Sequence, residues 1–405
     1  MKIAGAMKIA EATLFALRIP FTESFSHSVL SRTYSDSIAV RVKATDGTVG
    51  YGEAVARPYV TGETVESCLA FMTDEIWPAI ATTHYAPLNP NWLEQEQAEP
   101  DRLDWLAAIG ATIPAGQPNG AIAWNAARTG FELALLDCLL KRQKLSLAAI
   151  LPPKRQSIVY SGVITASSVE SAVKRAKYFR LFGLEQIKVK TTVEGSRDAS
   201  IQESYQRLAA IRQAVGPDVS LRIDGNGAYD VETAIALCQH LQDLRIDSAE
   251  QLIPRSDPAQ MAQLKAASPI AIMVDESLIT IEDAKRLINA NACDFFNLRL
   301  AKCGGLARTI EIAQQAQAAG IQLQLGCQVG ETAILSATGR HLAAWLEDVT
   351  FVEGSYGTLL LAEDISRESL RFGHGGKASL LHRPGLGIVV QDPILEKYAH
   401  QRIQL

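Results

Sequence analysis

The sequence has little of what marks nucleic-acid-binding, membrane or disulfide-rich proteins. Its 39 Lys and Arg residues against 44 Asp and Glu leave a formal net charge of -5, and no basic stripe stands out, so nucleic acid is not an expected partner. No run approaches the ~20 apolar residues that a bilayer span requires, so no membrane association is expected. The six cysteines form no CxxC pair, which favours free thiols in a reducing, cytoplasmic setting.

Targeting and nucleotide-binding signals are also missing. The N-terminal stretch lacks the apolar segment and cleavage site of a signal peptide, and "MKIA" occurs at both Met1 and Met7, either of which is a candidate start. No Gly-rich phosphate loop follows any early strand, which disfavours a nucleotide site on an open sheet. "CGGLA" at 303–307 is too short for such a loop, although the amides of the helix it opens would suit an anion.

The chain changes character near residue 150. With 405 residues, 47% of them hydrophobic, it is long enough for one large barrel and a smaller domain. Before that point "SIAVRVKATDGTVGYGE" predicts two strands around an Asp46-Gly47 turn, and helical segments follow. "LPPKR" at 151–155 interrupts this pattern. We therefore expect an α+β domain over 1–150 and a second domain from 151 to 374.

The second domain shows a repeating strand–helix pattern. Eight strands are expected, at 157–164, 185–190, 219–226, 246–252, 270–277, 295–302, 321–327 and 349–355. Helical segments separate them, which predicts an α/β fold with a parallel sheet. Eight such units favour a closed barrel of the TIM type, in which the functional site lies at the carboxyl ends of the strands.

Two lysines stand one residue apart in the second of these strands. Side chains alternate along a strand, so Lys188 and Lys190 point to the same face. A buried ammonium is costly unless it is paired, and two neighbouring ones repel each other. Such a pair needs a partner of opposite charge, and it favours a lysine that gives up its proton readily enough to act as a base.

Acidic residues follow the next three strands in phase with the repeat. Asp224, Glu250, Asp275 and then Lys302 are separated by 26, 25 and 27 residues, about one strand–helix unit each. Their side chains should therefore converge at the mouth of the barrel. Three carboxylates in one space require a hard divalent cation, and Mg²⁺ fits because it accepts a few carboxylates together with substrate oxygens and water. A carboxylate substrate near such a cation acquires an acidic α-carbon, for which Lys190 and Lys302 are candidate bases on opposite faces.

Each of these residues also has a purely structural interpretation. Asp224 is suited to an Asx turn with "GNG", and Asp275 to capping the following segment. A single strand lysine is often an edge residue whose amine reaches solvent. Asn226, Gln251 and Asn297 stand beside the acidic positions, either as hydrogen-bonding supports of the ligands or as ordinary strand-end amides. The occurrence of all six charged residues in phase favours the functional interpretation.

The sequence resembles the enolase superfamily, specifically the muconate lactonizing enzyme subgroup. The resemblance rests on the "KVK" strand, the Asp/Glu/Asp series and "KCGG" after the sixth strand, and it covers nearly the whole chain. It implies a modified TIM barrel, (β/α)7β-like, with an N-terminal α+β capping domain near which residues of about 375–405 pack. It implies Mg²⁺ (or Mn²⁺) on Asp224, Glu250 and Asp275. It also implies Lys190 as acid/base, Lys188 beside it at the substrate carboxylate, and Lys302 as second base or cation.

Residues that this chain lacks reduce the choice of reactions within the subgroup. Acid-sugar dehydration needs a histidine at the end of the seventh strand, where the chain has "LQLGCQVGE". Dipeptide epimerases carry Asp-x-Asp after the eighth strand, where this chain has Gly354 and Tyr356. We therefore expect a muconate-like cycloisomerase, with N-acylamino acid racemase, dipeptide epimerase or o-succinylbenzoate synthase as alternatives. A non-catalytic binding protein of the same ancestry is a more distant alternative.

Substrate specificity is expected in the loops around the barrel mouth. "GEAVARPYVTGET", which contains Tyr59, resembles the capping-domain loop that closes over substrate, and "FTESFSHSVLSRTY" is a second such segment. Arg32 or Arg57 would clamp a distal carboxylate, unless both are solvated loop residues. The full set of candidate substrate-binding residues is His27, Arg32, Tyr59, Asn226, Cys327, Glu331, Glu353 and Tyr356. The expected partner is a small carboxylate, and a homo-oligomer is expected.

Overall fold

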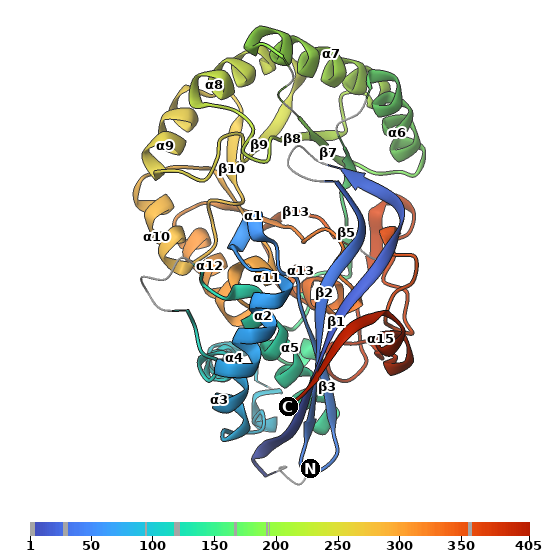
Figure 1. Cartoon of the computed structure of the whole chain (residues 1–405). Helices are drawn as coiled ribbons and strands as arrows, with labels where there is room; N and C mark the ends of the chain where they lie inside the picture. The colour runs from blue at the N-terminus through green and yellow to red at the C-terminus, as the bar shows by residue number, and fades with distance from the viewer. Residues whose placement is uncertain are drawn as a thin grey trace.

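The computed structural model describes all residues except 1–4, 27–30, 94, 117–121, 166–167, 192, 194 and 355–358. The capping domain is built on an antiparallel sheet of order β15-β1-β2-β3, with β4 paired to β1. Its strands are β1 (Met7–Ser26), β2 (Ser31–Ala44), β3 (Val49–Ala54), β4 (His84–Tyr85) and β15 (Ala399–Gln404). The C-terminal strand β15 thus pairs with β1 (Figure 1), and the Leu405 amide donates to the Ala12 carbonyl.

Helices cover one side of this sheet. They are α1 (Pro58–Thr61), α2 (Val65–Phe71), α3 (Trp77–Ala81), α4 (Glu99–Ala111) and α5 (Asn125–Arg142). Helix α5 approaches β3 so closely that a Cβ on Gly52 would lie 1.8 Å from the Gly130 carbonyl oxygen, so only glycine fits there. The expected β2–β3 hairpin is confirmed, with Gly47 at φ 89° in the turn after Asp46.

The second domain contains the predicted eight-stranded parallel sheet. Its strands are β6 (Gly162–Ile164), β7 (Gln186–Lys190), β8 (Ser220–Asp224), β9 (Ile246–Glu250), β10 (Ala271–Val274), β11 (Phe295–Leu298), β12 (Gln322–Leu325) and β13 (Val349–Val352). They follow one another in sequence order, and a hydrogen bond from the Ser161 amide to the Val352 carbonyl links the two ends. The prediction of a barrel-like α/β fold with an α+β cap is confirmed.

Helices pack around the outside of the curled sheet (Figure 1). They are α6 (Val169–Leu181), α7 (Arg197–Val215), α8 (Val231–His240), α9 (Pro258–Ala267), α10 (Ile281–Asn289), α12 (Leu306–Ala318) and α13 (Ala333–Trp345). Several begin at a side-chain cap, as at Asp230, which accepts the Thr233 amide proton, and Thr280, which accepts that of Asp283. No helix among the described residues is both long and apolar enough to cross a bilayer.

The expected first barrel strand at 157–164 is in fact two elements. Strand β5 (Ser157–Val159) pairs antiparallel with β14 (Lys377–Ser379), and β6 alone belongs to the barrel sheet. The change of partner falls at Tyr160 and Ser161, whose amides donate to Gly376 and Val352 respectively. Alternating apolar residues run through both strands, so the sequence pattern does not reveal this switch. Helix α15 (Asp392–Tyr398) then leads into β15.

Two buried glutamates of the capping domain hold barrel helices at their N-termini. Glu53 accepts the Thr332 amide (2.9 Å) ahead of α13, and Glu132 accepts the Ala307 amide (2.8 Å) at the start of α12. The anion expected near "CGGLA" is therefore Glu132 of the chain itself. A Cβ on Gly305 would meet the Glu132 carboxylate at 1.7 Å, which explains the glycine. Carboxylates at helix N-termini stabilise the helix through its unpaired amides and dipole.

Candidate active site

The lysines and carboxylates singled out in the sequence lie together at the carboxyl ends of the barrel strands. Lys188 and Lys190 are on β7, while Asp224 and Glu250 end β8 and β9 and are neighbours in the parallel ladder. Asp275 immediately follows β10. All are buried, the most exposed being Lys190 at 9%. Such burial is tolerable only because the charges pair with one another.

Lys188 is held by three carboxylates. Its Nζ donates to Glu353 (2.7 Å) and Glu250 (3.0 Å), and it lies 3.3 Å from Asp224. Burial alone would lower the pKa of Lys188, but the attraction of Glu250, Glu353 and Asp224 outweighs it and raises the pKa well above its ordinary value. Among these three carboxylates Lys188 is a cation, which suits it to binding a substrate carboxylate.

Lys190 faces the cavity beside an Asx turn. Its Nζ donates to Asp224 Oδ2 (3.0 Å) and Asn226 Oδ1 (2.5 Å). The Asn226 amide donates to Asp224 Oδ1 (3.0 Å), so the turn considered from the sequence is present together with the ion pairs. Burial opposes ionisation of Asp224, but Lys190 and Lys188 hold its pKa below the ordinary range. The structural and functional interpretations of Asp224 are thus compatible.

Lys302 is on a short helix and not at a strand end as expected. Strand β11 stops at Leu298, and Lys302 belongs to α11 (Leu300–Cys303), which Gly304 ends at φ 90°. This turn brings Nζ to the Asp275 carbonyl (2.7 Å), Asp275 Oδ1 (2.8 Å) and the Asn297 carbonyl (2.7 Å). Burial lowers the pKa of Lys302 to about 8, and the charge of Arg299 acts in the same direction.

Besides Arg175, which lines the large cavity described below, three charged residues of the site were missed in the sequence. Arg299 pairs with Asp275, lies 3.7 Å from Glu250 and donates to Gln328. Arg222, fully buried two residues before Asp224, bonds Glu353 (3.2 Å). The alternation argument that singled out the lysines would have found it.

Glu276 is the third. It lines the cavity and accepts from Asn226 (3.3 Å). Burial, followed by repulsion from Asp224 and Glu250, raises the pKa of Glu276 to about 6. Its position directly after Asp275 in "VDES" was a visible signal.

A cavity of about 540 Å³ opens above the lysines. Of the candidate substrate-binding residues, Tyr59, Asn226, Cys327 and Glu353 line it. Its lining includes the charged side chains of Lys188, Lys190, Asp224, Glu276, Arg299 and Arg175, and the aromatic side chains of Tyr178, Phe179, Phe182 and Phe372. This volume is in the range of sites for small-molecule ligands.

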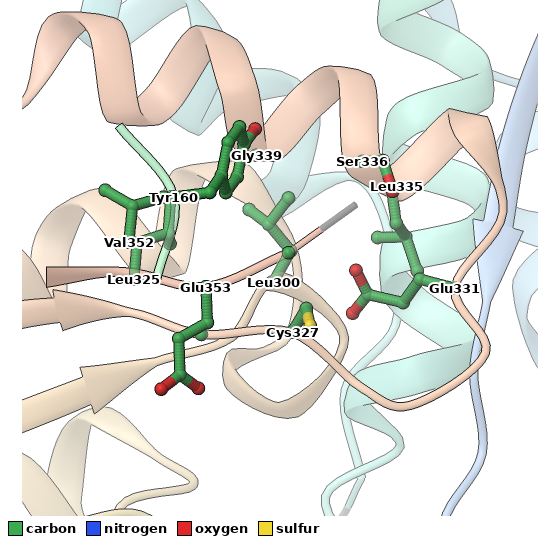
Figure 2. Close-up of a pocket in the computed structure, with 12 residues that line it drawn as sticks. Tyr160, Leu300, Leu325, Cys327, Glu331, Leu335, Ser336, Gly339, Val352 and Glu353 are labelled. Atoms are coloured by element: carbon green, nitrogen blue, oxygen red, sulfur yellow. The ribbon is translucent and has the colours of Figure 1, made fainter. Parts of the chain in front are cut away.

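Glu331 lies in a smaller, separate space of about 20 Å³. Figure 2 shows Cys327 between Glu331 and Glu353 at this position. Glu331 accepts the Gln328 amide (2.6 Å), and burial raises its pKa to about 8. Burial first, and then the charges of Glu331 and Glu353, raise the pKa of the Cys327 thiol. The volume is sufficient for a single water molecule, and the hydrogen bond from Gln328 to Glu331 lies within the loop after β12.

The arginines expected to clamp a distal carboxylate have other contacts. Arg32 pairs with Asp36 (3.2 Å). Arg57 is fully buried and donates to the carbonyls of Ala56, Asp36 and Val329, so it is neither a clamp nor a solvated loop residue. Neither arginine is among the described residues that line the large cavity. His27 and Tyr356 lie outside the described residues.

The donor chemistry fits a hard divalent cation. Asp224, Glu250 and Asp275 offer carboxylate oxygens from consecutive strands, which are the ligands that Mg²⁺ prefers. Cationic side chains lie between them: Lys188 bridges Asp224 and Glu250, and Arg299 contacts Glu250 and Asp275. With these cations in place, no three acidic, His or Cys side chains of the described segments converge on one point. A bound ion would therefore require Lys188 and Arg299 to move aside.

Comparison with known proteins identifies the class. The model of the family "Enolase C-terminal domain-like" matches residues 170–394, more than half of the chain. The chain therefore belongs to the enolase superfamily, as the "KVK" and Asp/Glu/Asp pattern predicted. Among curated relatives it is 27% identical to N-succinyl-L-Arg/Lys racemase of Bacillus cereus, over 96% of this chain and 98% of that protein. It is 28% identical to muconate cycloisomerase 1 of Pseudomonas putida, over 90% of each.

Solved structures give the same assignment. The N-succinyl Arg/Lys racemase of B. cereus superposes with a TM-score of 0.84 at 25% identity, over 98% of this chain and 100% of that one. The dipeptide epimerase of Enterococcus faecalis, in complex with Mg and L-Leu-L-Tyr, has a TM-score of 0.77 at 26% identity, over 94% and 99%. The chain thus falls among racemases, epimerases and cycloisomerases, all isomerases of the superfamily.

Proposed function

We propose that the protein is a Mg²⁺-dependent racemase of N-acylated amino acids. The observation that carries this proposal is the placement of two amines on either side of the carboxylate set. Lys190 reaches it from β7 at Asp224, and Lys302 reaches it from α11 at Asp275. Two such groups can address opposite faces of one α-carbon, which inversion of configuration requires.

The residues at the end of β13 favour a substrate whose α-amino group is acylated over a substrate whose α-amino group is free. Glu353 is already neutralised by Lys188 (2.7 Å) and Arg222 (3.2 Å), so it is not available to a substrate ammonium. Gly354 next to it has no side chain to offer. An N-acyl substrate carries no α-ammonium and needs no such partner, and the similarity to the N-succinyl-L-Arg/Lys racemase over nearly the whole chain supports this choice.

The reaction would proceed by proton transfer at the α-carbon. Lys188, held as a cation beside Glu353, binds the substrate carboxylate. One of the two lysines, in its neutral form, takes the α-proton, and the C–H electron pair moves onto the carboxylate. The other lysine, as an ammonium, returns a proton to the opposite face, and exchange with water restores both. Mg²⁺ on Asp224, Glu250 and Asp275 would supply positive charge where negative charge develops on the substrate.

Cycloisomerisation of a muconate-like diacid, the reaction favoured from the sequence, is the second candidate. Tyr59 lines the cavity, as the resemblance of its loop to the cycloisomerase version implies, and muconate cycloisomerase 1 is a relative over most of the chain. This reaction needs only one acid/base. A small diacid would leave much of the cavity of about 540 Å³ unfilled, which is why we place it second.

Proton NMR in D₂O with MgCl₂ tests the proposal. The enzyme is offered N-succinyl amino acids, a dipeptide pool and muconolactone in separate tubes. Loss of the α-proton signal with accumulation of both enantiomers of an N-succinyl amino acid is the expected result. Exchange only in the lactone tube would establish the second candidate. Epimerisation confined to dipeptides would show that the preference for an acylated amino group, inferred from the end of β13, is wrong.

A further inference from the structure

A single asparagine of the capping domain contacts both loops that carry the Asp275–Lys302 pair. Asn125, the first residue of α5, is fully buried. Its Nδ2 donates to the Lys302 carbonyl (2.6 Å) and to the Ile279 carbonyl (2.8 Å). A side-chain amide nitrogen has two protons, so both hydrogen bonds can form at once.

The two acceptors belong to segments that meet at the active site. Ile279 closes the segment that follows Asp275, and its carbonyl is four residues from that carboxylate. Lys302 is on α11, and its Nζ returns to Asp275 (2.8 Å). The same two segments are therefore joined twice, by the hydrogen bonds of Asn125 and by the ion pair between Lys302 and Asp275. Movement of either loop would change the position of the Lys302 amine.

Neighbouring contacts fix α11 against α5. The Thr129 hydroxyl, one turn along α5, is 3.1 Å from the Leu300 carbonyl, at the start of α11. Gly304 ends α11 directly over the asparagine, since a Cβ there would lie 2.7 Å from Asn125 Oδ1. The short helix has too few internal hydrogen bonds to hold its own position, so these contacts from another domain determine it.

Asn125 is in turn connected to the loop that carries Tyr59. Glu63 follows this loop and accepts the amides of Ala126 (3.0 Å) and Ala127 (3.1 Å), the two residues after Asn125. Glu63 is fully buried, and Gly62 ends α1 immediately before it. A continuous set of hydrogen bonds thus runs from the loop with the cavity-lining Tyr59, through the N-terminus of α5, to α11.

We propose that Asn125 is the positioning residue for Lys302, and that the hydrogen bonds from the Ala126 and Ala127 amides to Glu63 let the Tyr59 loop determine where the Lys302 amine stands. Asn125 touches no reacting atom in this proposal and acts only through the two carbonyls. The proposal rests on the proposed function insofar as Lys302 is one of two acid/bases. A purely structural role for Asn125 would affect the whole fold and both lysines alike.

The test uses Asn125→Ala, which leaves both carbonyls unpaired, and Asn125→Asp, which has nearly the same shape but sets a carboxylate against them. Glu132→Gln is the matched control, because it weakens another contact between the capping domain and the barrel, at Ala307. In D₂O, each enantiomer of an N-succinyl amino acid loses its α-proton to the lysine on its own face. A displaced Lys302 should slow racemisation by about tenfold to a hundredfold.

One enantiomer should nevertheless keep its wild-type exchange rate. Lys190 still removes its proton and, after exchange with water, returns a deuteron to the same face. Asn125 variants are therefore expected to show exchange with retention for one enantiomer only, while Glu132→Gln keeps the wild-type ratio of exchange to racemisation. Equal loss of exchange for both enantiomers would overturn the proposal.

Amide hydrogen exchange supplies a readout that needs no substrate. Asn125→Ala is expected to speed exchange in residues 300–303 and 277–280 selectively, with β7 and β8 unchanged and Glu132→Gln close to wild type in these segments. Unchanged protection of 300–303 would overturn the positioning role even if the wild type racemises. A different outcome is that the wild type exchanges no α-proton while Asn125→Ala still speeds amide exchange selectively in these segments. This outcome would refute the proposed function and leave the positioning of α11 by Asn125 established.

Discussion

Lys188 and Glu353 form an ion pair, 2.7 Å from Nζ to Oε2, that joins β7 to the end of β13 inside the barrel. Arg222 from β8 contacts the same carboxylate at 3.2 Å. Glu353 therefore connects strands that are far apart in the order of the sheet. The pair also explains why two lysines share one strand face, since each has its own carboxylate: Glu353 for Lys188 and Asp224 for Lys190.

Removing the charge of Glu353 should destabilise the fold. Glu353→Gln leaves Lys188 with Asp224 and Glu250 but deprives Arg222 of its carboxylate in a buried site. We expect the free energy of unfolding to fall by about 2–4 kcal/mol, measured by urea denaturation. Glu363→Gln is the control, because its ion pair with Lys397 is exposed and should change stability little. Equal stability of the two variants would contradict the structural role of Glu353.

Glu53 should make stability depend on pH. Burial raises the pKa of Glu53 to about 7, against 4.5 for the free side chain. The folded state therefore binds the proton more tightly than the unfolded state does. The stability that this provides is complete below about pH 4.5 and is lost as the pH rises through about 7.

The comparison is made with Glu53→Gln, which cannot titrate. Between pH 4.5 and 7 the unfolding free energy of the wild type should decrease relative to the variant, by up to about 3 kcal/mol. Glu347→Gln, at an exposed position, should follow the wild type. Parallel pH curves for wild type and Glu53→Gln would show that the carboxyl is not shifted.

The strand–helix repeat was sufficient to predict that Asp224 and Glu250 lie at strand ends. Because each unit has nearly the same length, Asp224 and Glu250 fall at equivalent strand ends, and both do end β8 and β9. The repeat was less informative for Lys302, where one turn of helix replaces the strand end. Gly304 was the local signal for that turn, since it takes the left-handed conformation that ends α11.

No local signal in the sequence indicated the contacts between the two domains. Asn125 and Lys302 are 177 residues apart, and nothing in the periodicity of α5 or α11 relates them. Glu53 and Glu132 looked like ordinary strand and helix residues until their partners at α13 and α12 were visible. Hydrogen bonds of this kind depend on how two independently folded surfaces meet, and a single sequence does not carry that geometry.

Mg²⁺ should stabilise the protein through the carboxylate set. An ion that binds the folded state alone raises the unfolding free energy by about 2.7 kcal/mol at a hundredfold excess over its Kd. We expect Tm to rise with MgCl₂ and to return to its starting value with a chelator. Asp224→Asn should abolish most of this rise, while Glu132→Gln, which removes the charge of a buried carboxylate at the start of α12, should keep it. An equal rise in both variants would place the ion elsewhere.

Replacing each lysine separately should show which face of the substrate α-carbon that lysine serves. Lys302→Met keeps a long side chain but removes the amine from its position at Asp275. Racemisation should fall below detection, while one enantiomer of an N-succinyl amino acid still exchanges its α-proton with D₂O. Lys190→Ala should show the reverse, exchanging only the other enantiomer and retaining the wild-type fold by circular dichroism. If Lys302→Met abolished exchange of both enantiomers and Lys190→Ala abolished neither, Lys302 would be the sole base. If Lys302→Met racemised normally, the reaction would need only Lys190, as cycloisomerisation does.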